Sequence, residues 1–452
     1  MVTRVLVANR GEIALRVIRA CRELGLSPVA VHSSADDGSP HVAAADAAVR
    51  IGPAPAALSY LSVPAVLEAA RITGADTVHP GYGLLSEDAD FAEACRAEGL
   101  TFVGPDTEAL RLLGDKISAR RFAASAGLPV APGSEEPVSS AEDARAQAGL
   151  IGYPLILKAA AGGGGRGMEV VRSPDDLEEV FTRVRAAAAA LFNDERVFVE
   201  RFIGGARHVE IQIMGDLHGT VVHLGSRDCS LQRRNQKIVE EAPAPGLPGD
   251  LLDRMAEDAV RCARRLGYHG AGTFEFLVEP DGRYWFIEAN CRIQVEHPVT
   301  EMVTGVDLVQ EQLRVASGLP VGPVPSDPST RGCSIECRIN AEDPDRDFRP
   351  SPGRLTEVVL PSGPFVRVDG HIAPGSVVPA EYDPLLAKVV VWAPDRPGAI
   401  ARMERALAEC RIEGPGVRTN LAFLRDLLRH PRFVAATHDT ALLSELIPGG
   451  RP

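Results

Sequence analysis

The sequence predicts an α/β domain, in which helices wind around both faces of a parallel sheet, followed by α+β units. Two observations carry this prediction. Short apolar runs alternate with helical segments through the first hundred residues, separated by loops of a few residues. From about residue 153 the pattern changes to strands and a hairpin. At 452 residues, with roughly 150 residues per domain, about three domains are expected.

In the first domain, strands are expected at 5–8, 28–34, 75–79 and 101–105, and helices over 13–24 and 63–73. Pro64 begins the second helix and Gly74 stops it. Ligands gather at the carboxyl ends of strands in such sheets. Residues 10–12 and 79–83 follow two of these strands and are therefore positional candidates, although turn chemistry explains their glycines equally well.

Beyond residue 113 the pattern predicts a middle unit to about 318 and a C-terminal unit after it. Residues 135–148 read as a surface helix and 319–330 as a Pro/Ser-rich linker. The other expected elements are strands at 154–160, 197–203 and 208–215, a hairpin over 272–290 that turns at Asp281-Gly282, strands at 333–340, 354–361 and 385–392, and a helix over 400–410.

Composition excludes several classes of protein. The chain has 48 basic and 61 acidic residues and a net charge of −13, which disfavours non-specific binding of nucleic acid. No apolar run approaches the ~20 residues of a membrane-spanning helix, and the first residues enter a strand without a signal core. The 8 cysteines form no CxxC pair. A cytoplasmic protein without disulfides or structural zinc is expected.

Lysine is scarce. Only Lys116, Lys158, Lys237 and Lys388 occur, and arginine is otherwise the cation. A lysine kept in such a chain hints at a site that needs a compact ammonium. Chance survival in solvent is the alternative, so the four are candidates only.

The segment 288–296 is the clearest chemical motif. Glu288, Asn290, Arg292, Gln294 and Glu296 alternate with apolar or small residues. In extended backbone they would share one face. Carboxylate and amide oxygens suit Mg²⁺, and a guanidinium suits an oxyanion. A solvated edge strand would show the same alternation.

Four further features are candidates for chemistry, and the glycine cluster among them favours a nucleotide lid. Glu275 lies between two phenylalanines across the hairpin from Glu288, where a shared cation would give both carboxylates a partner. The glycine cluster 162–167 follows Lys158 and suits a phosphate-wrapping loop, although a hinge is the alternative. Segment 227–241 holds Lys237, with a solvated charged loop as the alternative. Arg338 lies on the polar side of an alternating strand.

Taken together, ANRGEIALRVIRAC, HPGYGLLSED, GGGGRGM, RHVEIQ, RDCSLQRRNQK, GAGTFEF, EANCRIQVEHPVTE and ECRINAEDP resemble the biotin carboxylase component of biotin-dependent carboxylases, over residues 2 to about 445. The resemblance implies an ATP-grasp fold: a pre-ATP-grasp domain (1–113), an ATP-grasp domain (114–318) with a glycine-rich lid (131–203), and a C-terminal domain (331–446). It implies a ligase that makes carboxyphosphate from MgATP and bicarbonate and then carboxylates biotin on a carrier protein.

The resemblance also implies residue roles. ATP would be bound by Lys116, Lys158, Gly164, Gly165, Glu200, Arg201, Phe202, Ile203, His208, Gln232, Asn235, Glu275 and Glu288. Magnesium or manganese would be held by Glu275, Glu288 and Asn290, and bicarbonate by Lys237, Arg292, Gln294 and Val295. Glu296 would deprotonate bicarbonate, Arg338 would steady the biotin enolate, and Tyr82 would contact biotin. Lys388 receives no role.

The sequence departs from the family pattern at several positions. Asn235 and Ser226 stand for the usual histidine and acid, and Arg201 for a lysine at the adenine. Ala161 and Ala289 replace a lid glycine and a methionine. No metal ligand, base or bicarbonate residue is lost, so altered ATP affinity is expected instead of lost catalysis.

The resemblance implies three partners: a biotin carboxyl carrier, a carboxyltransferase and a second copy in a homodimer. The four lysines include no biotinyl-lysine motif, so the carrier is a separate chain or a segment outside this sequence. The resemblance implies an acyl-CoA or related acceptor, as in fatty acid biosynthesis, and leaves acetyl-CoA, propionyl-CoA, pyruvate and others open. The alternatives are an ATP-grasp ligase with another acceptor and a non-catalytic nucleotide-binding partner.

Overall fold

The computed structural model describes residues 2–162, 165–322 and 331–447. The predicted linker at 319–330 lies largely outside these residues. The N-terminal domain holds a five-stranded parallel sheet in the order β3-β2-β1-β4-β5. Its elements are β1 (Arg4–Val7), α1 (Gly11–Glu23), β2 (Ser27–Ser33), α2 (Pro40–Ala44), β3 (Ala47–Gly52), α3 (Val63–Thr73), β4 (Thr77–His79), α4 (Ala89–Ala97) and β5 (Thr101–Phe102). The doubly wound domain is therefore confirmed.

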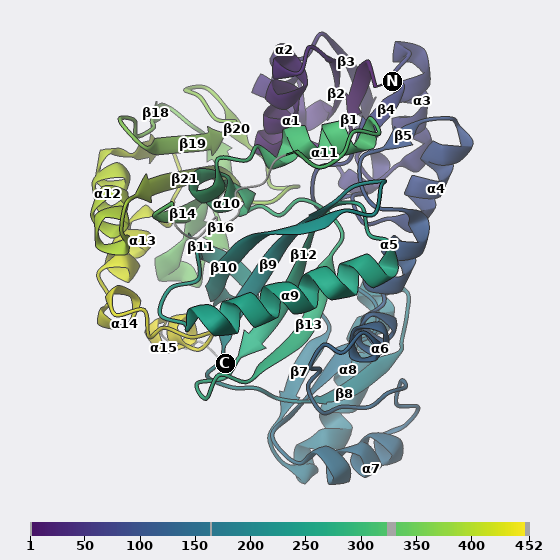
Figure 1. The fold of residues 1–452 in the computed structure, drawn as a ribbon. Coiled ribbons are helices and arrows are strands. Elements are labelled where there is room, and N and C mark those ends of the chain that lie inside the picture. The colour runs from purple at the N-terminus through teal and green to yellow at the C-terminus, as the bar shows by residue number, and fades with distance from the viewer. Residues whose placement is uncertain (1, 163–164, 323–330, 448–452) are drawn as a thin grey trace.

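The segment that follows forms two connecting helices and a small lobe with a three-stranded antiparallel sheet, ordered β7-β6-β8. Its elements are α5 (Thr107–Gly114), α6 (Lys116–Ser125), α7 (Ala141–Ile151), β6 (Leu155–Ala159), β7 (Met168–Val171), α8 (Leu177–Phe192) and β8 (Val197–Arg201). The helix expected from residue 135 begins six residues later, because Ser140 is its N-cap and accepts from the Asp143 amide. This lobe projects from the rest of the molecule (Figure 1).

One eight-stranded sheet continues from the middle of the chain into its C-terminal part, in the order β13-β12-β9-β10-β11-β14-β21-β19. The middle part supplies β9 (Arg207–Gly215), β10 (Val221–Arg233), β11 (Gln236–Ala242), α9 (Gly249–Leu266), β12 (Gly270–Val278), β13 (Tyr284–Asn290), α10 (His297–Thr304) and α11 (Leu308–Ala316). The sheet thus crosses the boundary expected near 318–331, and the domain limits themselves stay a prediction.

The C-terminal part adds three strands to that sheet, three short two-stranded ribbons and a helical layer. Its elements are β14 (Cys333–Asn340), β15 (Glu342–Asp343), β16 (Arg349–Pro350), β17 (Gly353–Arg354), β18 (Glu357–Val359), β19 (Val366–Gly370), β20 (Val377–Val378), β21 (Leu385–Ala393), α12 (Arg396–Glu409), β22 (Arg411–Glu413), α13 (Leu421–Leu428), α14 (Pro431–Val434) and α15 (Leu442–Leu446). The strand expected at 354–361 is broken into parts of β17 and β18.

The two faces of the large sheet differ because side chains alternate along each strand. Val209 and Ile211 of β9 and Phe274 of β12 pack in one core with α9, which lies across that face (Figure 1). The alternate residues, among them Glu210 and Glu275, therefore face the other way. That second face carries buried charged groups and the helix α10. None of the helices in the described part of the chain has the length and apolar character needed to cross a lipid bilayer.

Candidate active site

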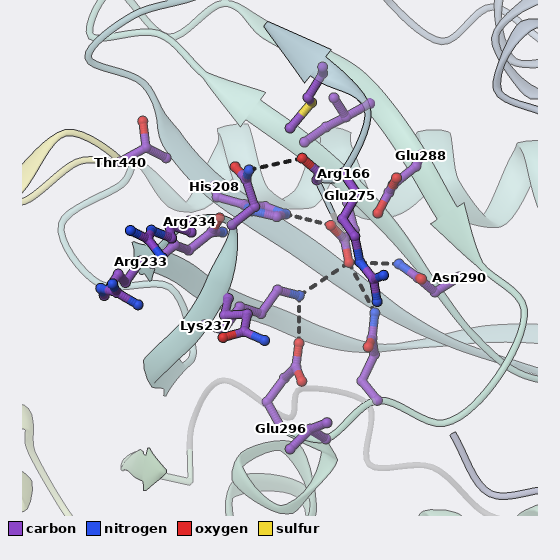
Figure 2. Close-up of a pocket in the computed structure, with 18 of the residues that line it drawn as sticks. Arg166, His208, Arg233, Arg234, Lys237, Glu275, Glu288, Asn290, Glu296 and Thr440 are labelled. Atoms are coloured by element: carbon purple, nitrogen blue, oxygen red, sulfur yellow. Dashed lines mark hydrogen bonds and ion pairs between the residues drawn. The ribbon is translucent and has the colours of Figure 1, made fainter. Parts of the chain in front are cut away.

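A cavity of about 1330 Å³ lies between the N-terminal domain, the small lobe, the large sheet and the C-terminal part. All of the predicted site residues that the structure describes line it; Gly164 lies outside the described residues. Figure 2 shows how the side chains from the β-sheet and from the loop before α10 converge in it. The cavity therefore brings together positions between residues 82 and 338.

The carboxylate pair that the hairpin predicts is present. Glu275 on β12 pairs directly with Glu288 on β13. Asn290, at the end of β13, donates from Nδ2 to Glu275 Oε1 across 2.7 Å, and Lys116 Nζ lies 3.6 Å from Glu288 Oε2. Three oxygen-bearing side chains beside an ammonium suit a hard divalent cation next to a polyphosphate.

Lys237 occupies the centre of an acidic cluster. Its Nζ donates to Glu210, Glu275 and Glu296 at 2.7, 3.1 and 2.5 Å. Burial lowers the pKa of this ammonium, but the surrounding acidic groups outweigh burial and raise it well above its ordinary value. Lys237 is therefore a permanent positive charge in a closed site.

Glu296 is held by two cations. Besides Lys237, Arg338 donates from Nη2 to Glu296 Oε2 across 2.9 Å, and its Nε donates to Glu240 across 2.6 Å. Burial raises the pKa of Glu296, whereas the charges of Lys237 and Arg338 hold it well below its usual range. The carboxylate is thus ionised and can accept a proton.

The structure corrects one prediction about the segment 288–296. The strand ends at Asn290, and residues 291–296 form a loop that leads into α10, so the five polar residues do not share one strand face. Arg292 nevertheless contacts Glu87 at 2.7 Å, Asn290 at 2.9 Å and Gln294 at 2.8 Å. We call residues 291–296 the 291–296 loop.

The other end of the cavity contains the predicted nucleotide residues. Lys158 donates to Glu200 across 2.5 Å. His208 lies 2.6 Å from Glu275 and also contacts Gln232. Burial lowers the pKa of His208, but the Glu275 charge outweighs burial and raises it, which favours the protonated imidazole beside Glu275.

Four further predicted nucleotide residues lie at the end of β8 or in the β10–β11 turn. The Arg201 guanidinium lies over the Trp285 ring, 5.1 Å from its centroid, and pairs with Glu279. Phe202 and Ile203 follow β8 and line the wall. Asn235 donates from Nδ2 to the Gly165 carbonyl across 3.2 Å, which links the β10–β11 turn to the glycine-rich loop.

Tyr82 also lines the cavity. Its hydroxyl donates to Glu12, and Asn9 fixes the Tyr82 loop by donating to the Pro80 and Tyr82 carbonyls at 2.7 and 2.8 Å. Tyr82 and Arg338 both line the cavity.

Sequence reasoning missed several residues that shape the site. Glu210 alternates with His208 in RHVEIQ, so period two was an available signal. Glu240 lies within the charged segment 227–241, which forms buried strands and is no solvated loop. Glu87 contacts Arg292 from 205 positions away, and no local pattern marks it.

Family models match three consecutive segments of the chain. Residues 1–110 match the biotin carboxylase N-terminal domain, residues 115–323 the carbamoyl-phosphate synthase L chain ATP-binding domain, and residues 336–445 the biotin carboxylase C-terminal domain. This order is that of the three-domain architecture implied by the motifs.

Whole relatives show the same likeness. The chain is 49% identical over 443 residues to a biotin carboxylase of Nostoc sp., covering 98% of this chain and 99% of that one. It is 51% identical over 434 residues to the Haemophilus influenzae biotin carboxylase, covering 96% of each.

Solved structures agree. The complex of Campylobacter jejuni biotin carboxylase with a β,γ-ATP ligand superposes with a TM-score of 0.95 at 44% identity, over 98% of this chain and 99% of that one. The biotin carboxylase domain dimer of Hydrogenobacter thermophilus 2-oxoglutarate carboxylase, bound to MgADP and bicarbonate, gives 0.95 at 42% identity over 98% of each chain. The chain therefore belongs to the biotin carboxylase family and has its ATP-grasp fold.

Proposed function

We propose that the chain carboxylates biotin with bicarbonate and ATP in this cavity, through carboxyphosphate, with the predicted residues in the roles given below. The observation that carries the proposal is the ionised Glu296 carboxylate between Lys237 and Arg338. It offers a proton acceptor where an anionic substrate would meet two cations. The nucleotide residues and Tyr82 line the same cavity.

A divalent cation fits the carboxylate pair. Glu275 and Glu288 come from adjacent positions on paired strands, and the Asn290 amide lies beside them. When bound there, Mg²⁺ or Mn²⁺ would neutralise charge on the ATP phosphates. The chain's own contribution is to hold the three oxygen donors together, with His208 and Gln294 orienting Glu275 from 2.6 and 3.0 Å.

The phosphates of ATP would be bound by ammonium groups and backbone amides. Lys116 begins α6 and Lys158 lies on β6, and both reach the cavity next to the glycine-rich loop. In the described structure Lys116 contacts the Gly162 carbonyl and Glu288. Lys158 contacts Glu200. A phosphate would replace these protein contacts, and positioning and charge neutralisation are what phosphoryl transfer requires.

Bicarbonate would lie at the 291–296 loop, contacting Arg292, Gln294, the Val295 backbone and Lys237. An anion that takes hydrogen bonds from Lys237 competes with Glu296 for the ammonium. Loss of that contact raises the pKa of Glu296 and makes it a stronger base at the moment its substrate is bound. The proton passes from bicarbonate to Glu296, and the freed oxygen attacks the γ-phosphorus as ADP departs.

Biotin would enter on the Tyr82 side, with Arg338 stabilising the negative charge on its enolate. Membership of the family implies a biotinylated carrier protein or domain as the partner. We propose a homodimer, because the Hydrogenobacter relative was solved as a domain dimer, and a carboxyltransferase, because the family resemblance implies one. A cytoplasmic location is proposed too; the 8 cysteines are all free and buried.

The test is ADP release from MgATP by the purified chain, with and without bicarbonate and then free biotin. Release that needs bicarbonate and rises with biotin is expected. Bicarbonate-dependent release without any effect of biotin or a biotinylated carrier would favour an ATP-grasp ligase with another acceptor. Tight ATP binding without release, even with carrier and transferase added, would favour a non-catalytic nucleotide-binding partner.

A further inference from the structure

Lys388 on β21 lies behind the cavity wall and is fully buried. The other three lysines line the cavity. Its Nζ donates to the Val295 carbonyl across 2.8 Å and lies 3.0 Å from Glu12 Oε1. One side chain of the C-terminal part therefore contacts both the 291–296 loop and the first helix of the N-terminal domain.

The carbonyl groups of the 291–296 loop are held one after another. His297 Nδ1 contacts the Gln294 carbonyl at 2.7 Å, and the Val299 amide donates to the Glu296 carbonyl. Lys388 holds the carbonyl between these two. The backbone carbonyls of Gln294, Val295 and Glu296 are thus each bound by another group of the protein. The side chains of Gln294 and Glu296 line the cavity.

The surroundings keep Lys388 charged and in place. Its cross-strand neighbours are Arg338 on β14 and Asp369 on β19, and Glu336 lies on the same face of the sheet. Burial lowers the pKa of the ammonium, but the charges of Glu12 and Asp369 oppose burial and the pKa is raised. The lysine thus donates to the loop as a cation, and hydrogen bonds from charged donors are the stronger ones.

Glu12 connects Lys388 with Tyr82. Glu12 accepts the Tyr82 hydroxyl, so the path from Val295 through Lys388 and Glu12 to Tyr82 consists of buried or half-buried polar contacts. It connects the loop proposed for bicarbonate with the side proposed for biotin.

We infer that Lys388 is a positioning residue of the reaction: by holding the Val295 carbonyl it sets the direction of Gln294 and Glu296, and through Glu12 it sets their spacing from Tyr82. The inference rests on the proposed function, because it assigns Lys388 to the loop that would bind bicarbonate.

The test is Lys388→Met, which keeps the unbranched apolar stem of the side chain and removes the donor. The Michaelis constant for bicarbonate should rise roughly tenfold, as expected for the loss of a charged hydrogen bond, while that for ATP stays within about twofold. The matched control is Arg396→Met. Arg396 is a cation of the same part of the chain, paired with Glu241 at 2.7 Å, away from the cavity lining; it should lower stability and leave both constants unchanged.

A second variant covers the case in which Lys388→Met fails to fold. Glu12→Gln/Lys388→Met removes both charges together, and its bicarbonate constant is compared with that of Glu12→Gln alone. An unchanged bicarbonate constant in a folded variant overturns the inference and leaves the proposed function intact. Absence of bicarbonate-dependent ADP release in the unmodified chain would instead overturn the proposed function.

Discussion

Lys237 donates to Glu296 across 2.5 Å at the centre of the cavity. In the proposed reaction, this contact would let a strongly acidic carboxyl group serve as a base. While Lys237 is paired with it, Glu296 is ionised but binds protons weakly, since the pKa is held far below the ordinary value. Arrival of an anion that claims the ammonium would restore its basicity, so the base becomes active only in the presence of substrate.

Replacing Lys237 by methionine should destabilise the fold. Three buried carboxylates, Glu210, Glu275 and Glu296, lose their shared cation, and breaking a buried ion pair costs about 3–5 kcal/mol. Lys237→Met/Glu275→Gln should recover part of that loss, because Glu210 and Glu296 each keep an arginine partner whereas Glu275 keeps none in the ranges that the structure describes. The midpoints of denaturant unfolding measure both effects. Equal midpoints for Lys237→Met and the unmodified chain would contradict this account of the cluster.

Glu336→Gln should stabilise the chain, and more at pH 8 than at pH 5.5. Among the described residues neither carboxyl oxygen of Glu336 has a hydrogen-bond partner. Burial raises its pKa well above the ordinary value; Lys388 and Arg338 oppose the shift, whereas Glu240 and Glu296 add to it.

The sign follows from proton binding. Above about pH 4.5 the unfolded chain releases the Glu336 proton and the folded chain keeps it, so stability falls as pH rises. The glutamine variant removes this loss, which grows by about 1.4 kcal/mol per pH unit while the folded group stays protonated. Thermal unfolding at the two pH values tests it, with exposed Glu381 changed to glutamine as the control. A gain that is equal at both pH values would contradict a retained proton.

Asn235→Ala should raise the Michaelis constant for ATP roughly two- to tenfold. The variant loses the hydrogen bond to Gly165, and a neutral hydrogen bond of this kind contributes about 0.5–1.5 kcal/mol. The bicarbonate constant should not change and serves as the internal control. Asn235→His, which restores the family's usual residue, should lower the ATP constant; no change in either variant would show that this turn does not contribute to ATP binding.

Glu288→Gln should raise the Mg²⁺ concentration needed for half-maximal ADP release about tenfold. The amide keeps the shape but loses the negative charge that favours a divalent cation. The control is Glu279→Gln, a carboxylate at the other end of the hairpin that pairs with Arg201. Identical Mg²⁺ dependence in Glu288→Gln and the unmodified chain would remove Glu288 from the proposed metal site.

Much of the fold is readable from local pattern. The range 63–73 is a helix as expected, and the Asp281-Gly282 turn brings Glu275 opposite Glu288. The alternation of polar and apolar residues predicted a strand over 288–296, but the strand ends at Asn290. In the 291–296 loop Ile293 is buried and Arg292 contacts Glu87. That bend depends on distant partners, which period-two reasoning does not see.

The candidate site was accessible to sequence reasoning to a similar degree. Three of the four scarce lysines line the cavity, so composition alone pointed to them. The position of Lys388 depends on the pairing of β21 with β14 and on the docking of α1, and both bring together residues far apart in the chain. Its contact with Val295 therefore emerges only from the folded structure.

The central claim is that Glu296 deprotonates bicarbonate for attack on ATP. The most direct measurement compares ADP release by the unmodified chain and by Glu296→Ala, each with MgATP, bicarbonate and biotin. The account predicts bicarbonate-dependent release by the unmodified chain, and a loss of at least about a hundredfold in the variant, the scale of a general base. Equal release by the two proteins would contradict it.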